Sequence, residues 1–256
     1  MIVFAVGDVV GEVGCRFLRS RLPAFRKYRG IDLCIANGEN SAAGNGITPE
    51  SAGYLLSSGV DFITTGNHVY KRREVYDYLD ENEFIIRPAN FYSENPGRGY
   101  SVIDMGRYSV AVMNLSGNMY LDYAENAFVT ADRVLEKIGD VKMKLLDFHA
   151  EATSEKRAMG FYLDGRVSAV FGTHTHVQTA DEQLLAGGTG YITDLGMTGP
   201  VNSVLGVDIK TVTERFINGM PARFSNPDTA CEMGGCIFEL DEKSGKCLSV
   251  ERIQLT

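Results

Sequence analysis

The chain has 256 residues, 44% of them hydrophobic and 23% charged, which excludes a disordered or fibrous protein and allows a sizeable buried core. Its net charge of −8 at pH 7 argues against broad, non-specific binding to nucleic acid. No run of 18 apolar residues and no signal-peptide pattern occurs, and the five cysteines show no pairing or metal-ligand spacing. We therefore expect a cytoplasmic protein with no membrane contact.

Apolar runs alternate with helical patterns along the first third of the chain. We expect strands at 2–7, 32–36 and 60–65, and helices at 13–28, from about 48 onward, and at 71–81. Pro23 is expected to bend or break the first helix, whereas Thr48 and Pro49 form a good start for the second.

The rest of the chain is richer in strands. We expect helices at 126–139 and 153–163, and strands at 84–86, 100–104, 108–113, 143–148, 167–171, 183–185, 190–192, 235–240 and 247–253. Tight turns predict hairpins around 105–107 and 243–246, and the strands at 183–185 and 190–192 predict another. No long linker divides the sequence. We therefore predict a single α/β domain spanning residues 1–256, with two sheets packed together and helices outside them.

Polar residues follow the predicted strands of this sheet pair. The four histidines lie in three segments, each of which follows an apolar run directly, and the two N-terminal strands lead into Gly7-Asp8 and Gly38-Glu39-Asn40. Ligands of open α/β sheets bind beyond the carboxyl ends of the strands. The residues expected to meet at that edge are Asp8, Glu39, Asn40, Asn67, His68, His149, His174 and His176.

These side chains together indicate a metal site. Asp8 or Glu39 alone could be a turn or cap residue, but His174 and His176 alternate in an extended segment and so point the same way. Oxygen and imidazole ligands without thiolate suit manganese, iron, zinc or cobalt better than calcium or magnesium. Seven candidate ligands are too many for one ion, which predicts two ions about 3.5–4 Å apart that share a carboxylate.

The motifs around these residues resemble the calcineurin-like metallophosphoesterase superfamily and, more narrowly, the bacterial YmdB family. The resemblance covers essentially the whole length and rests on the segments 7–11, 37–40, 65–68, 87–91, 147–156, 172–181 and 193–200. It implies a four-layer αββα sandwich of two mixed sheets with helices outside. The chain departs from the superfamily at Val10, where most relatives carry histidine, and at Glu39-Asn40, where most carry aspartate. The oxygen-rich first site favours iron or manganese over zinc or cobalt.

The same resemblance implies the roles of the residues. Asp8, Glu39, Asn40 and His176 would hold the first ion, and the second would be held by Glu39, Asn67, His149 and His174. A metal-bridging hydroxide would attack phosphorus, and His68 would protonate the leaving oxygen as general acid. The family implies a metal-dependent phosphodiesterase that hydrolyses 2′,3′-cyclic nucleotides to nucleoside monophosphates, with other phosphoesters open as substrates.

Further residues carry weaker signals. Arg87 and Asn90 are candidates for substrate binding, because arginine suits phosphate geometry. The aromatic residues Phe91, Tyr92 and Tyr120 could stack on a base, although core packing is the more common role. Candidates for orienting the histidines are Asp147, Asp181 and Asp194.

Two other functions stay open at this point. A regulatory protein could bind a cyclic nucleotide or an RNA-processing partner and turn over slowly. A metal-dependent amidohydrolase also uses His-x-His, but near its first barrel strand, and eight regular βα units are not visible here. We also expect the chain to form a homo-oligomer.

Overall fold

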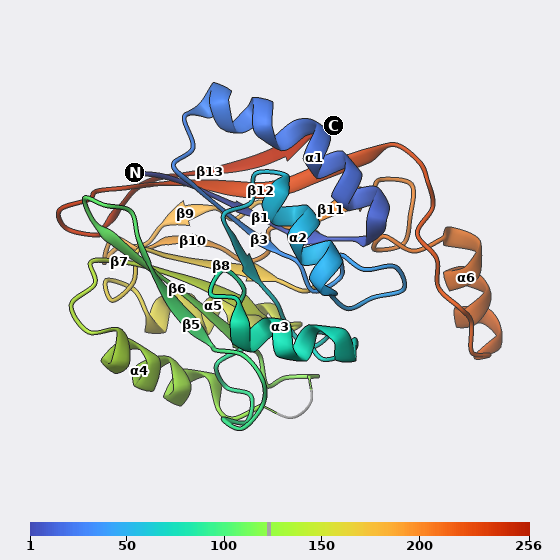
Figure 1. The fold of residues 1–256 in the computed structure, drawn as a ribbon, viewed down its shortest axis with the longest axis horizontal. Helices are drawn as coiled ribbons and strands as arrows, with labels where there is room; N and C mark the ends of the chain where they lie inside the picture. The colour runs from blue at the N-terminus through green and yellow to red at the C-terminus, as the bar shows by residue number, and fades with distance from the viewer. Residues whose placement is uncertain (122–123) are drawn as a thin grey trace.

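The computed structural model describes residues 1–121 and 124–256. Two β-sheets stack face to face, and helices cover their outer faces (Figure 1). The helices are α1 (Gly11–Arg29), α2 (Pro49–Ser57), the 3-10 helix η1 (Arg73–Val75), α3 (Tyr76–Glu81), α4 (Ala127–Ile138), α5 (Thr153–Tyr162) and α6 (Ile209–Asn218).

The first sheet is built from both ends of the chain. Its order is β2-β11-β12-β1-β3-β4, and β13 pairs with β12. β1 runs parallel to β3, which runs parallel to β4, whereas β12 is antiparallel to β1. The strands are β1 (Ile2–Val6), β2 (Asp8–Val9), β3 (Leu33–Asn37), β4 (Phe62–Thr64), β11 (Met197–Pro200), β12 (Cys231–Leu240) and β13 (Cys247–Leu255).

The second sheet uses the middle of the chain in the order β5-β6-β7-β8-β10-β9. Its four inner strands are parallel, and the edge strands β5 and β9 are antiparallel hairpin partners of β6 and β10. The strands are β5 (Tyr100–Asp104), β6 (Ser109–Ser116), β7 (Met143–His149), β8 (Ala169–Thr173), β9 (Gln183–Leu184) and β10 (Gly190–Ile192).

Alternation along the strands produces the layers. In β1, Val3 and Ala5 face the second sheet and join the core between the sheets, whereas Phe4 packs toward α1 and α2 on the outer side. On the second sheet, Val134 of α4 and Met159 of α5 belong to the opposite outer core. The predicted four-layer αββα class is therefore confirmed.

Most predicted elements are present, with three corrections. α1 runs through Pro23 as one helix, so the proline does not break it. The predicted strand at 84–86 is reduced to a single bridge between Ile85 and Ile63, because the backbone N–H of Arg87 turns away to the carbonyl of Arg98. The sequence analysis also missed α6 and the short strands β2 and β11. Among the described residues, no helix combines the length and apolarity needed to span a bilayer.

Candidate metal centre

The eight residues expected at the strand ends lie in one cluster, although they span positions 8 to 176. Asp8 opens β2, His149 ends β7, and the remaining six follow β3, β4 and β8 directly. Parallel strands present their carboxyl ends at a common edge. Because the two sheets stack face to face, the carboxyl ends of their strands lie close together, and the polar side chains of both sheets meet there.

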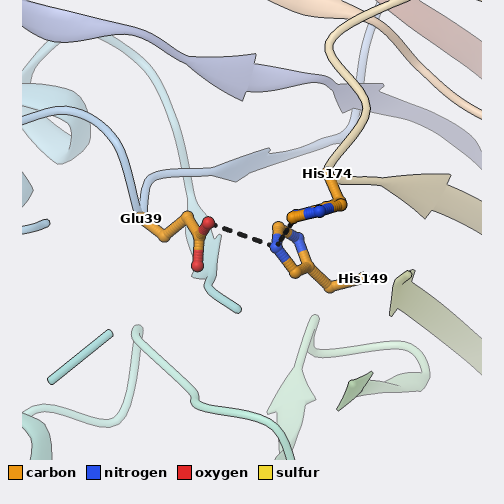
Figure 2. A group of neighbouring side chains, drawn as sticks. All are labelled: Glu39, His149 and His174. Atoms are coloured by element: carbon orange, nitrogen blue, oxygen red, sulfur yellow. Dashed lines mark hydrogen bonds and ion pairs between the residues drawn. The ribbon is translucent and has the colours of Figure 1, made fainter. Parts of the chain in front are cut away.

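Glu39, His149 and His174 form the centre of the cluster (Figure 2). One ligand atom of each lies within 4.8 Å of those of the other two. His149 Nε2 is 3.1 Å from Glu39 Oε1, 3.1 Å from His174 Nδ1 and 3.0 Å from Asn67 Oδ1. We call Asn67, His149 and His174 the His149 group.

A second set of side chains lies on the other side of Glu39. Asn40 Nδ2 is 3.3 Å from His176 Nε2, 3.5 Å from Asp8 Oδ1 and 3.4 Å from Glu39 Oε1. His176 Nε2 is also 3.5 Å from Asp8 Oδ1. We call Asp8, Asn40 and His176 the Asp8 group; Glu39 Oε1 is close to atoms of both groups.

Hydrogen bonds outside the cluster fix which imidazole nitrogen faces inward. Thr173 Oγ1 donates to Asp147 Oδ1 at 2.6 Å, so it accepts from His149 Nδ1 at 2.9 Å. His176 Nδ1 donates to the carbonyl of Leu205 at 3.0 Å. In both histidines this leaves Nε2 directed at the cluster, which is the usual arrangement of metal-binding histidines.

His174 uses the opposite nitrogen. Its Nε2 is 3.1 Å from Glu151 Oε2, so Nδ1 is the atom that faces His149. His174 has φ 98° and His176 has φ 63°, a left-handed conformation that is uncommon for residues other than glycine. Such conformations persist where the surroundings hold them, and they cluster at functional sites.

The Thr175 between these histidines is clamped by a buried ion pair. Asp194 Oδ2 accepts from Thr175 Oγ1 at 2.8 Å and from its backbone N–H at 3.2 Å. The same oxygen accepts from Lys156 Nζ at 2.6 Å, and both charged side chains are 1% exposed. The pair therefore positions the His-Thr-His segment without belonging to the cluster.

Charges within the cluster are strongly coupled. Burial disfavours the charged carboxylates, but neighbouring histidines outweigh it and lower the pKa of both Asp8 and Glu39. Burial also opposes protonation of His149, yet Glu39 beside it raises the pKa of His149 to about 9. For His174, burial and then His149 lower the pKa to about 4, which keeps it neutral. The carboxylates thus stabilise positive charge at the point where Glu39 and His149 meet.

The donor set fits metal ions. Glu39 Oε1, His149 Nε2 and Asn67 Oδ1 face a common point, where a bound cation would take the place of a proton on His149 Nε2. Carboxylate, amide and neutral imidazole ligands suit transition metals. The candidates for holding ions are therefore the Asp8 group, the His149 group and Glu39.

His68 differs from the other histidines. Its side chain is 22% exposed, whereas that of His149 is fully buried. Its backbone N–H donates to Glu39 Oε2 at 2.9 Å, and its Nδ1 lies 2.8 Å from Asn40 Oδ1. His68 is thus placed at the rim of the cluster.

Two predicted substrate-binding residues lie elsewhere. The Arg87 guanidinium donates to the carbonyls of Pro88, Tyr92 and Asn95, and the buried Asn90 amide donates to carbonyls of Ser116 and Glu125. Both side chains hold loops, and neither joins the cluster.

Of the three aspartates expected to orient histidines, two act through a threonine. Asp147 acts on His149 through Thr173, and Asp194 holds Thr175. Asp181 binds Thr179 and Thr193 instead. The sequence analysis missed Thr173, Thr175, Glu151 and Lys156, and their only signal was proximity to the histidines within the same motifs.

Comparisons with known proteins identify relatives that match nearly the whole chain. A protein of Bacillus subtilis named 2′,3′-cyclic-nucleotide 2′-phosphodiesterase is 41% identical over 99% of this chain and 96% of its own length. A crystal structure of a hypothetical protein from Thermus thermophilus superposes with a TM-score of 0.94 at 38% identity, covering 99% of this chain and 98% of that one. A structure described as a novel phosphatase from Mycoplasma pneumoniae has a TM-score of 0.95 at 31% identity, covering 100% and 93%.

These relatives confirm, at the level of the family, the prediction of an enzyme of the phosphoric ester hydrolase class. A profile described as YmdB-like protein matches residues 4–253, nearly the whole chain. The matched residues include every residue of the cluster at the strand ends, and the chain therefore belongs to the YmdB-like family.

Proposed function

We propose that this protein is a dinuclear metal phosphodiesterase that hydrolyses 2′,3′-cyclic nucleotides. The observation that carries the proposal is the pair of partly to fully buried ligand groups that meet at Glu39. A carboxylate in contact with both groups is the arrangement that two adjacent ions require. The substrate class is proposed from the name of the 41% identical relative.

The Asp8 group with Glu39 would hold one ion, and the His149 group with Glu39 would hold the other. When bound, such ions would supply Lewis-acid activation of water and of the phosphoryl group. The Asp8 group has two oxygen-bearing side chains and one imidazole, so we propose iron or manganese as the metals.

Asn40 links this site to His68. Its Nδ2 now faces Asp8 and His176, and half a turn about its Cβ–Cγ bond would direct Oδ1 there as a ligand. The turned Nδ2 would then donate to His68 Nδ1, which lies 2.8 Å from the present Oδ1. That bond fixes the ring proton on His68 Nε2, and we propose that His68 donates it to the leaving oxygen.

The test is metal analysis of the purified protein, together with hydrolysis of 2′,3′- and 3′,5′-cyclic nucleotides. We expect close to two equivalents of metal and preference for the 2′,3′ isomers. His68→Ala should keep the metal and lose at least about a hundredfold in kcat, as expected for a general acid. Less than one equivalent under varied metal supply, with no turnover of any phosphodiester, would refute the proposal.

We further propose that the chain assembles with a second copy of itself through α6. This helix lies apart from the sheets (Figure 1). Its apolar residues Phe216 and Ile217 are 84% and 80% exposed, and Met220, just after the helix, is 64% exposed. Light scattering of the wild type and of Phe216→Glu checks this: the variant should have a lower mass, and equal masses would refute it. The cytoplasmic location and an RNA-processing partner stay predictions.

A further inference from the structure

A cleft of about 440 Å³ opens beside the metal centre, at Asn67. Asn67 Oδ1 is 3.0 Å from His149 Nε2, so the cleft begins at a residue of the His149 group. Four of the residues that line it are aromatic; the lining includes Asn67, Tyr70, Phe91, Tyr92, Asn95 and Tyr120. None of its described lining residues is charged.

Two of the aromatic side chains form the packed floor of the cleft, and two form its exposed rim. Phe91 is 9% exposed and packs 6.2 Å from the ring of Tyr70, whose hydroxyl donates to the carbonyl of Pro96 at 2.7 Å. Tyr92 is 59% exposed and Tyr120 is 82% exposed. Core packing therefore explains Phe91 but not the two exposed tyrosines at the rim.

Arg87 holds the backbone of the turn that carries Tyr92. Its Nη2 lies 3.4 Å from the carbonyl oxygens of Tyr92 and Asn95, so one buried guanidinium fixes both ends of this turn. The backbone N–H of Asn95 also donates to the carbonyl of Tyr92 at 3.0 Å. The backbone of this turn therefore needs little ordering when a ligand binds, which favours affinity.

The chemistry of the cleft suits a neutral, flat heterocycle. Aromatic side chains stack on any base because every base has a π face. The lack of charged residues in the described lining makes a phosphate or a charged peptide a poor occupant, and the Asn95 amide could offer a donor and an acceptor. The volume lies within the range of small-molecule sites.

We propose that this cleft binds the nucleobase of the substrate, with Tyr92 and Tyr120 as stacking residues, while the phosphate lies at the metal centre. The proposal rests on the proposed function and deepens it. It gives Arg87 an indirect part in recognition, as the residue that positions Tyr92. It also predicts that the enzyme distinguishes a nucleotide from the same cyclic ester without a base.

The test compares 2′,3′-cyclic AMP with ribose 2,3-cyclic phosphate, which has the same diester ring but no base. For Tyr92→Ala, the ratio of kcat/KM for the nucleotide to that for the abasic ester should fall about tenfold, the change expected for one lost aromatic stack. Tyr92→Phe should preserve the ratio, because it keeps the ring. Tyr28→Ala is the matched control, since Tyr28 is an exposed tyrosine on α1, away from the cleft.

A wild-type ratio near one, or an equal loss on both substrates in Tyr92→Ala, would overturn the base site while leaving the phosphodiesterase intact. If the wild type hydrolyses no diester, the proposed function fails instead. In that case calorimetric binding of intact 2′,3′-cyclic AMP still decides the matter. Equal Kd values for wild type and Tyr92→Ala would overturn the base site, and a roughly tenfold weaker Kd would support it.

Discussion

Lys156→Met should destabilise the protein far more than an ordinary lysine substitution. Lys156 Nζ and Asp194 Oδ2 are 2.6 Å apart, and both side chains are 1% exposed. Methionine has a similar shape but no charge, so Asp194 would stay buried without its cation, with only the Thr175 hydroxyl and the backbone N–H groups of Thr175 and Gly196 as donors. Removing one partner of a buried ion pair costs about 3–5 kcal/mol of unfolding free energy.

Urea unfolding in the presence of a chelator measures this cost without a contribution from bound metal. The double variant Lys156→Met/Asp194→Asn leaves no buried charge, and its amide oxygen can still accept from Thr175, so it should be more stable than Lys156→Met alone. Lys137→Met is the control, because Lys137 is an exposed lysine in the last turn of α4. A loss below about 1 kcal/mol in Lys156→Met, or a double variant no more stable than the single one, would refute this reasoning.

Two further substitutions test how His149 is held. Thr173→Val removes the hydroxyl that accepts from His149 Nδ1, so metal affinity measured by chelator competition should fall about 10–100-fold. Thr173→Ser keeps the hydroxyl and should retain the affinity. Equal metal affinities for the valine and serine variants would contradict the role of the hydroxyl. Gly66→Ala would place a Cβ 2.2 Å from the His149 ring, so it should abolish metal binding by displacing that ring. Gly53→Ala, a helix position with open space, should keep the metal and gain about 0.5–1 kcal/mol of stability; unchanged metal content in Gly66→Ala would show that the ring adapts.

The sequence predicted the residues of the site because strand ends are a local feature. Each of Asp8, Glu39 and His149 follows or ends an apolar run that is visible without any tertiary information. What it could not predict is how the edges of the two sheets meet. Thr64 of β4 donates to Asp147 of β7 at 2.5 Å, and this contact joins residues 83 positions apart. Only the packing of sheet on sheet fixes such a pair.

Some elements escaped prediction although their sequences carry a signal. α6 has a cap at Asp208, a left-handed Gly219 after its end and an apolar stripe formed by Ile209, Val212 and Phe216, but only Val212 of the helix is buried. β2 has two residues and exists only through pairing with β11, with Met197 opposite Asp8. Conversely, Tyr92 is an aromatic residue, a type that usually packs in the core, but its side chain is exposed on the surface.

Val10, where the superfamily resemblance leads us to expect histidine, is linked to how His176 is oriented. Val10 is 3% exposed, and a Cβ on Gly206 would lie 2.5 Å from Val10 Cγ1, so the 203–206 turn packs directly against this valine. That close approach brings the carbonyl of Leu205 to His176 Nδ1 at 3.0 Å. A histidine at position 10 would need the space that the turn occupies. Valine at position 10 is therefore coupled to a fixed orientation of His176, and in the proposed assignment Asn40, 3.3 Å from His176 Nε2, supplies the ligand that a histidine at position 10 would otherwise provide.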